Sequence, residues 1–315
     1  MTNNATIETA KGLTFGTELE YTNITREKAA KAIHSVVGGT VRYYGGGYDA
    51  WQVTAPDGRI WKAVSDGSLT DRATSAEVVT PILKWEDMET LQAVVRALRK
   101  AGAKTPSCTS QHVHVGVSAF SARQIANIAR IFYKQEELIL KAAGTLETRL
   151  SHYTKRTDRN FIARLEKAKP TTKAALNEAW FGYANPNPEH YDSARYRAIN
   201  LNNVWRTGTV EFRLFNGTTH AEEVKAHIQL CLAGFAERLE HEIPEELTVF
   251  NLVPDSIGGR RKLRTTNMIE FQNKELKKRT RCIKLFPNRE SLLRIATALL
   301  IELDETWLSE SKRYI

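Results

Sequence analysis

The chain has 315 residues, of which 42% are hydrophobic and 26% charged, and its formal net charge at pH 7 is +9. These values are typical of a folded globular protein, and no apolar run approaches the roughly 20 residues that a membrane-spanning helix needs. The N-terminal residues contain no apolar signal core, and the three cysteines have no metal-type spacing. We therefore expect a cytoplasmic protein without a disulfide framework.

The first 80 residues read as strands and turns. The stretch FGTELEY at 15–21 alternates like a strand, and residues 41–70 combine aromatic and β-branched residues with Gly and Asp-Gly turns, which indicates hairpins. The glycine-rich segment at 43–49 lacks the Lys-Ser/Thr pair and the following helix of a phosphate-binding loop. We interpret this segment as a hairpin turn.

Helices and strands alternate less regularly in the rest of the chain. The pattern predicts helices at 85–101, 121–143, within 151–180 and at 221–241, a loop at 181–196, and strands at 111–117, 196–205 and 208–215. Because this order is not the repeating βαβ of a parallel sheet, we expect a mixed or antiparallel sheet with helices packed on its back. A compact domain is predicted at 1–244, and a basic extension at 245–315 is predicted to end in an amphipathic helix.

Three of the predicted strands each carry two polar side chains that are two residues apart, with apolar residues between them. The pairs are Glu18 with Glu20, His112 with His114, and Glu211 with Arg213. Residues i and i+2 of a strand share one face, so each strand has an apolar side that can pack under helices and a side that can bind ions. Three such strands indicate a sheet whose polar face lines a cavity.

The residue types of these pairs indicate which ions such a cavity binds. Glu18, Glu20, Glu211 and a fourth carboxylate, Glu77, are hard oxygen ligands suited to Mg²⁺ or Mn²⁺, whereas three histidines would indicate zinc. Crowded carboxylates stay ionised only beside compensating positive charge, which divalent cations and arginines would supply. Such a set of residues is typical of phosphoryl transfer.

Five motifs in this order resemble those of the amidoligases, the carboxylate–amine ligases related to glutamine synthetase and glutamate–cysteine ligase. The motifs are FGTELE, DGSLT followed by SAEVVTP, HVHVG, RYRAIN and VEFRLFNGT, and the resemblance covers roughly residues 13–240. It implies an α+β fold with a curved, partly barrel-like antiparallel sheet of the glutamine synthetase type and helices on its outer face. The implied cofactors are ATP and Mg²⁺ or Mn²⁺, bound at the inner face.

The resemblance also implies a role for each matching residue. The implied metal ligands are Glu18, Glu20, Glu77, His112 and Glu211. His114, Arg195 and Arg197 would hold ATP, Arg213 would stabilise the transferred phosphoryl group, and Asp66 and Ser68 would contact substrate. The implied reaction joins a carboxylate, on a small molecule or a polymer, to an amine, either an amino acid or ammonia. It proceeds through an acyl phosphate and forms an amide or isopeptide-type bond.

The sequence leaves the substrates open. Candidate partners for a substrate carboxylate are Arg42, Arg59, Arg72, Arg149 and Arg206. Because all five motifs lie in one predicted domain, a monomer suffices, and a homo-oligomer is equally compatible. Two other function classes share part of the pattern, namely a metal-dependent hydrolase with the same His and Glu residues, and a nucleic-acid-binding protein with a degenerate ligase domain.

The whole net charge of the chain is concentrated in one segment. Residues 260–289 hold eleven Lys and Arg and two Glu, so their balance, eleven minus two, equals the +9 of the chain. Clustered cations of this kind bind phosphates in a salt-dependent way, although a solvated surface has the same composition. The hypothesis is that this segment binds an anionic partner, a nucleic acid or an acidic peptide, through Arg260, Arg261, Lys262, Lys277, Lys278 and Arg279.

Overall fold

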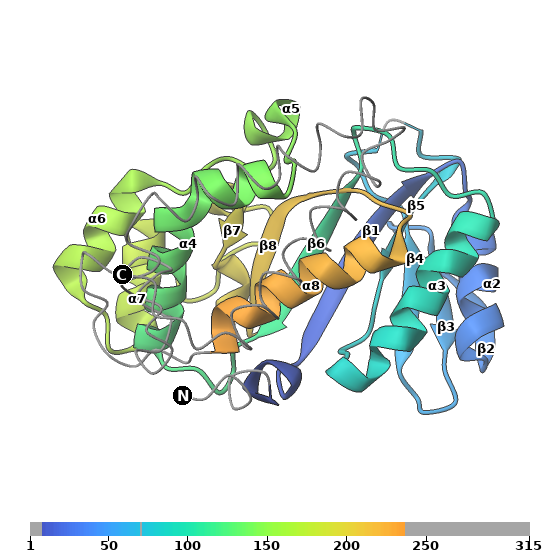
Figure 1. Cartoon of the computed structure of the whole chain (residues 1–315), viewed down its shortest axis with the longest axis horizontal. Helices are drawn as coiled ribbons and strands as arrows, with labels where there is room; N and C mark the ends of the chain where they lie inside the picture. The colour runs from blue at the N-terminus through green and yellow to red at the C-terminus, as the bar shows by residue number, and fades with distance from the viewer. Residues whose placement is uncertain (1–7, 70, 237–315) are drawn as a thin grey trace, which may run out of the picture. The chain divides into compact units, whose positions relative to one another are not determined.

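An antiparallel sheet of eight strands forms the centre of the computed structural model, which describes residues 8–69 and 71–236 (Figure 1). The order of the strands across the sheet is β2-β3-β4-β5-β1-β6-β8-β7. Their bounds are β1 Phe15–Thr22, β2 Thr40–Gly45, β3 Ala50–Thr54, β4 Ile60–Val64, β5 Ser75–Val79, β6 Ser110–Gly116, β7 Ile199–Asn200 and β8 Thr209–Asn216. The sheet is open, with β2 and β7 at its two edges, so the expected antiparallel sheet is confirmed and a closed barrel is not formed.

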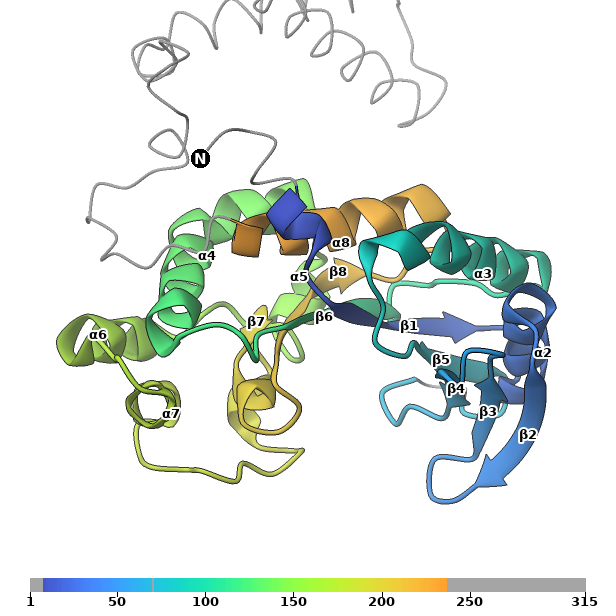
Figure 2. The ribbon, with the colours of Figure 1, turned by 90° about the horizontal axis from the view of Figure 1, so that it is seen from below.

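Helices α3, α4 and α8 lie on one face of this sheet, as Figure 2 shows, while α6 and α7 lie to its side. The bounds are α2 Arg26–Val37, α3 Met88–Lys100, α4 Ala122–Ala142, α5 Glu147–Leu150, α6 Arg159–Ala168, α7 Lys173–Phe181 and α8 Ala221–Ala236, with 3-10 helices η1 Trp85–Asp87, η2 Ser193–Arg195 and η3 Asn202–Val204. Helix α2 packs on β3 and β4, α8 packs on β6, and α3 lies between α2 and α8. The opposite face of the sheet is therefore left for polar side chains.

The central strand β1 shows why the sheet has two different faces. Its odd-numbered residues Phe15, Leu19 and Tyr21 are buried under the helices, whereas Glu18 and Glu20 project from the other side. The burial of three large side chains on one short strand stabilises the register of β1 against its neighbours, because a slip of one residue would move all of them to the polar face.

Two predicted elements are wrong in the structure. Residues 26–37, read as strand and turn, form helix α2, which Thr25 caps by accepting a hydrogen bond from the Lys28 amide, and which buries Ala29 and Ile33. The predicted strand at 196–205 shrinks to the two residues of β7, because the polar stretch after it turns into the 3-10 helix η3. The predicted final helix and the boundary after residue 244 lie outside the described residues.

We predict that Gly39→Ala destabilises the fold strongly. Gly39, between α2 and β2, has φ +83°, and a Cβ there would overlap the Thr54 carbonyl oxygen. The expected loss is about 3 kcal/mol of unfolding free energy, measured by urea denaturation. Gly47→Ala, in the adjacent hairpin turn with no atom within 4 Å of the added Cβ, is the matched control. Equal midpoints for both variants would contradict the prediction.

Candidate functional site

Strand register brings the predicted site residues together in the middle of the polar face. Glu18 on β1 lies opposite His112 on β6, and Glu20 lies opposite Glu77 on β5. The site continues from β6 to β8, because His114 on β6 lies opposite Glu211 on β8. Directly opposed residues of antiparallel strands have neighbouring side chains on one face. Four strands that are not all consecutive in sequence thus build one site.

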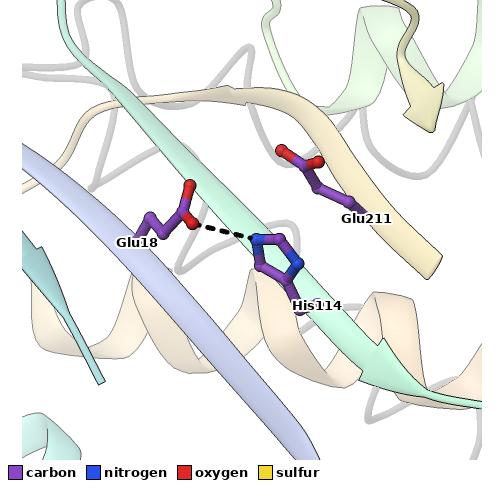
Figure 3. A group of neighbouring side chains, drawn as sticks. All are labelled: Glu18, His114 and Glu211. Carbon is purple, nitrogen blue, oxygen red and sulfur yellow. Dashed lines mark ion pairs between the residues drawn. The ribbon is translucent and has the colours of Figure 1, made fainter. Parts of the chain in front are cut away.

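Side chains of this face form three overlapping groups that could each hold a metal ion. The groups are Glu18, His114 and Glu211; Glu18, Glu77 and His112; and Glu20, Asp66 and Glu77, with ligand atoms within 4.8 Å of one another in each. Figure 3 shows the first group, in which the His114 ring points to the Glu18 carboxylate, with Nε2 and Oε1 3.4 Å apart. Glu18 and Glu77 each belong to two groups, so neighbouring ions would share ligands.

Asp66 belongs to the third of these groups. The resemblance implies a substrate contact for this residue and for Ser68, and the structure instead places the Asp66 carboxylate beside Glu20 and Glu77. The Ser68 amide donates a hydrogen bond to Asp66 Oδ1, so Ser68 orients that carboxylate. A role for Asp66 as a metal ligand is therefore compatible with the geometry.

Glu211 is the most firmly held carboxylate of the site. Arg213 Nη1 pairs with its Oε1, while the side-chain amides of Asn200 and Asn203 donate to its Oε2 at 2.6 and 3.0 Å. Burial opposes the charge, but Arg213 and the two histidines outweigh it and lower the pKa of Glu211 to about 2. Glu211 is thus ionised, and its carboxylate is held in one orientation.

The two histidines differ in protonation although they share one strand face. Burial and the nearby Arg213 lower the pKa of His112 to about 4, so this ring is neutral at pH 7. Its Nδ1 lies 3.0 Å from Glu18 Oε2 and its Nε2 lies 3.0 Å from Ser110 Oγ. Burial opposes the charge of His114 as well, but the carboxylates of Glu18 and Glu211 outweigh it and raise the His114 pKa.

The pKa of Glu18 is lowered, whereas the pKa values of its neighbours Glu20 on β1 and Glu77 on β5 are raised. Burial favours its neutral form, yet His114 and His112 outweigh burial and hold the pKa of Glu18 well below its usual range. Glu20 accepts a 2.7 Å hydrogen bond from the Ser110 amide, but burial raises the pKa of Glu20 to about 7. Burial and the surrounding carboxylates Glu18, Asp66 and Glu20 raise the pKa of Glu77 well above its usual value.

These residues fit divalent cations on two counts. Burial, together with neighbouring carboxylates, raises the pKa values of Glu20 and Glu77, so the charged forms of both residues need a cation beside them. In addition, His114 Nε2 is buried, makes no hydrogen bond and lies 3.4 Å from Glu18 Oε1, so the two atoms could ligate the same ion. Oxygen ligands with one or two imidazoles match Mg²⁺ or Mn²⁺.

The structure separates the two arginines that the resemblance assigns to ATP. Arg195 donates to the His190 carbonyl at 2.9 Å. Burial, Arg195 and Arg206 lower the pKa of His190 while Glu18 and Glu211 oppose this shift, so this loop lies within electrostatic reach of the site. Arg197 donates to the Arg156 carbonyl and lies 4.0 Å from Asp158 Oδ2. Arg195 is therefore placed near the site, whereas Arg197 is engaged elsewhere.

Three of the five arginines proposed for a substrate carboxylate have other partners, among them Arg206, which donates to His190 Nδ1 at 3.0 Å. Arg59 forms ion pairs with Asp57 and Asp87. Arg149 is buried and donates hydrogen bonds to the carbonyls of Phe215 and Arg213, so it stabilises the backbone of β8. Burial lowers the pKa of Arg149 to about 10, which still leaves it charged at pH 7.

Several residues that the structure places around the site were missed by the sequence analysis. Asn200 and Asn203, which hold Glu211, lie in a stretch read as a regular strand, and no local signal marks their role. Ser110 could have been found, because it lies two residues before His112 and so shares its face. Tyr48 and Tyr191, whose hydroxyl oxygens are 3.3 Å apart, come from turns 143 residues apart and meet only in the folded chain.

Comparison with known protein families agrees with this geometry. A model for the family described as "Putative amidoligase enzyme" matches residues 11–234, which include all of the site residues described above. The chain belongs to this amidoligase family, and the resemblance drawn from the five motifs is confirmed. No solved structure matches the chain.

A second family model, for transposases of the Mutator family, matches residues 205–310. Among curated proteins, a transposase for insertion sequence IS406 of Burkholderia multivorans is 49% identical over 74 residues, which are 24% of this chain and 18% of that protein. A transposase for ISRM5 of Rhizobium meliloti is 34% identical over 112 residues, 33% of this chain and 27% of that protein. The chain thus spans less than a third of the length of these relatives.

Two further predictions concern membrane-spanning helices and the basic segment. No helix in the described part of the chain is long and apolar enough to cross a membrane. The six Lys and Arg residues proposed to bind a polyanion, all within 260–279, lie outside the described residues.

We predict that metal binding at this site releases protons. Glu20, with a pKa of about 7, and Glu77, with a pKa raised well above its usual value, must lose protons before they ligate. Metal affinity should therefore rise as pH increases through 7 and fall below it. Calorimetric titration of Mg²⁺ at pH 7 in buffers of different ionisation enthalpy should show about one proton or more released per chain. Glu20→Gln should reduce that number, and heats that are independent of the buffer would contradict the prediction.

Proposed function

We propose that the protein is an ATP-dependent carboxylate–amine ligase that forms an amide bond through an acyl-phosphate intermediate. The observation that carries the proposal is the set of three overlapping His and carboxylate groups on one sheet face, with Arg213 beside them, in a chain of the amidoligase family. Glu18, Glu20, Asp66, Glu77, His112, His114 and Glu211 would hold Mg²⁺ or Mn²⁺ ions. When bound, such ions neutralise phosphate oxygens during phosphoryl transfer.

The reaction has two steps. First, an oxygen of the substrate carboxylate attacks the γ-phosphorus of ATP, the bond from that phosphorus to the bridging oxygen breaks, and ADP leaves. Second, the amine nitrogen attacks the acyl carbon, the bond from that carbon to the phosphate oxygen breaks, and phosphate leaves with the bonding pair while the amine loses a proton. Phosphorylation is needed because a free carboxylate does not react with amines.

The chain's own residues orient the reactants and balance charge. Arg213 is 5% exposed and is fixed by its ion pair with Glu211, so its guanidinium is preorganised to meet a transferred phosphoryl group. Preorganised groups of this kind each contribute several kcal/mol to the lowering of a barrier in order of magnitude. Arg195, held by the His190 carbonyl, would contact nucleotide phosphates.

We predict that Mg-ATP binding depends on Glu18. Calorimetry should show ATP binding to the wild type with Mg²⁺ or Mn²⁺, no binding with EDTA, and at least tenfold weaker binding for Glu18→Ala. Glu89→Ala, an exposed carboxylate in the first turn of α3, is the control and should bind as the wild type does. No ATP binding under any metal would overturn the ligase proposal and favour a hydrolytic metal centre.

Turnover gives a second test of the same site. In the presence of ATP, hydroxylamine traps an acyl phosphate as a hydroxamate, so no amine substrate has to be known. Glu20→Ala should lower the rate of hydroxamate formation by a factor of about 100 or more, because one metal ligand is lost. A variant whose rate stays within threefold of the wild type would contradict the role of Glu20.

We further propose that the basic segment at 260–289 binds nucleic acid. Its eleven Lys and Arg residues and the transposase family match over residues 205–310 support this second activity. The full chain with Lys277, Lys278 and Arg279 changed to Glu should bind duplex DNA more weakly. The slope of log affinity against log salt should fall in magnitude by about 3, as measured by fluorescence anisotropy. Arg99→Glu with Lys100→Glu on α3 is the control, and affinity that does not change with salt would contradict the proposal.

A further inference from the structure

A row of polar side chains crosses the sheet from its β2 edge to the carboxylates of the site. Arg42 on β2 lies opposite Gln52 on β3, and Gln52 lies opposite Lys62 on β4. Lys62 lies opposite Val79 on β5, and Val79 lies opposite Glu18 on β1. Because directly opposed residues of antiparallel strands project from the same face, Arg42, Gln52 and Lys62 share the face of Glu18.

The alternate residues of the same strands are packed away from this face. Val53 on β3 and Trp61 and Ala63 on β4 are buried, and α2 contacts both of these strands. Lys62 and Arg42 are exposed. Their side chains therefore project from the open side of the sheet, where the candidate metal groups lie.

Within the described part of the chain, Lys62 and Arg42 form no ion pair. Arg59, directly before β4, is by contrast held by two aspartates. Arg72, the remaining candidate of the β2–β5 side, is exposed and lies outside the strands. The row thus offers two unneutralised cations, with the amide of Gln52 between them as a hydrogen-bond donor.

The proposed function, on which this inference rests, requires two anions to meet at Glu18. One is ATP, and the cation Arg213 lies on β8, which is separated from β1 by β6. The other is the acid substrate, and the row stands on the other side of Glu18. Strands are about 4.8 Å apart, so the Lys62 backbone lies two strands, or about 10 Å, from that of Glu18. A long lysine side chain and a small acid together can bridge this separation.

We propose that Lys62 and Arg42 bind a second carboxylate of the acid substrate, one that is not phosphorylated. The substrate class is accordingly a small acid with at least two carboxylates, held at one end by the row and presented at the other end to the phosphoryl-transfer site. Arg206, by contrast, donates to His190 Nδ1 at 3.0 Å on the side of Arg195, so it belongs with the nucleotide side.

The test compares the full-length wild type with Lys62→Met, Arg42→Met and the control Lys100→Met, whose lysine is exposed at the end of α3. Hydroxamate formation with ATP is measured over straight-chain monocarboxylates and dicarboxylates of matched length, and Mg-ATP affinity is measured by calorimetry. Melting temperatures verify folding.

The wild type should prefer the best dicarboxylate over its matched monocarboxylate by at least tenfold in kcat/KM. Lys62→Met should raise the KM for the dicarboxylate at least tenfold, with the ATP affinity within twofold of the wild type.

An arm that does not depend on turnover uses glutarate as the probe. Acetylation of Lys62 by N-hydroxysuccinimidyl acetate, followed by mass spectrometry with Lys100 as the internal reference, should be slowed at least twofold by glutarate. Equal labelling together with an unchanged KM in Lys62→Met would overturn the inference. Loss of ATP affinity in Lys62→Met with an unchanged KM would also overturn it, because the row would then bind nucleotide phosphate. A wild type that binds no ATP but shows protection of Lys62 would refute the ligase proposal alone.

Discussion

Mutual repulsion among acidic side chains on one sheet face is the constraint on which the rest of the site depends. Five carboxylates, those of Glu18, Glu20, Asp66, Glu77 and Glu211, lie in overlapping groups whose ligand atoms are within 4.8 Å of one another. Such a cluster is costly in a folded protein unless cations or protons offset the charge. Arginine and histidine side chains of the chain compensate part of this negative charge. Protons or bound cations must compensate the rest.

The negative charge of the carboxylates is compensated to different degrees at the two ends of the site. At the β8 end, Arg213 and the two histidines keep Glu211 and Glu18 ionised, with both pKa values lowered. At the β5 end, burial outweighs the Ser110 hydrogen bonds and raises the pKa of Glu20 to about 7. The two ends would therefore respond differently to cations. The carboxylates at the β8 end are already ionised, whereas those at the β5 end must lose protons before they bind a cation. The protonation of Glu20 and Glu77 therefore depends on both metal concentration and pH.

The amidoligase match and the transposase match overlap at residues 205–234, which hold β8 and most of α8. In the structure this stretch is an integral part of the amidoligase sheet, because β8 pairs with β6 and carries Glu211 and Arg213. Residues after 234 match the transposase family alone, and they contain the basic segment. The proposed ligase chemistry and the proposed nucleic-acid binding thus rest on different parts of one chain.

The sequence by itself determined which face each site residue occupies. Alternation along β1, β6 and β8 places Glu18 with Glu20, His112 with His114 and Glu211 with Arg213, because the side-chain period of a strand is two residues. The helical period of apolar residues likewise located most of the helices, but α2, whose buried face is mostly alanine, was missed. The polar loop at 181–196 was also readable, since its Pro and Asn content is a local property.

Only the tertiary structure decided which strands lie side by side and therefore which side chains share a charge environment. The register of β1 between β5 and β6 sets Glu20 against Glu77, and the pairing of β8 with β7 and η3 sets the amides of Asn200 and Asn203 against Glu211. The order β2-β3-β4-β5 likewise aligned Lys62 with Glu18 through Val79. These contacts join residues far apart in sequence, and their electrostatic consequences depend on burial and distance, which no local pattern encodes.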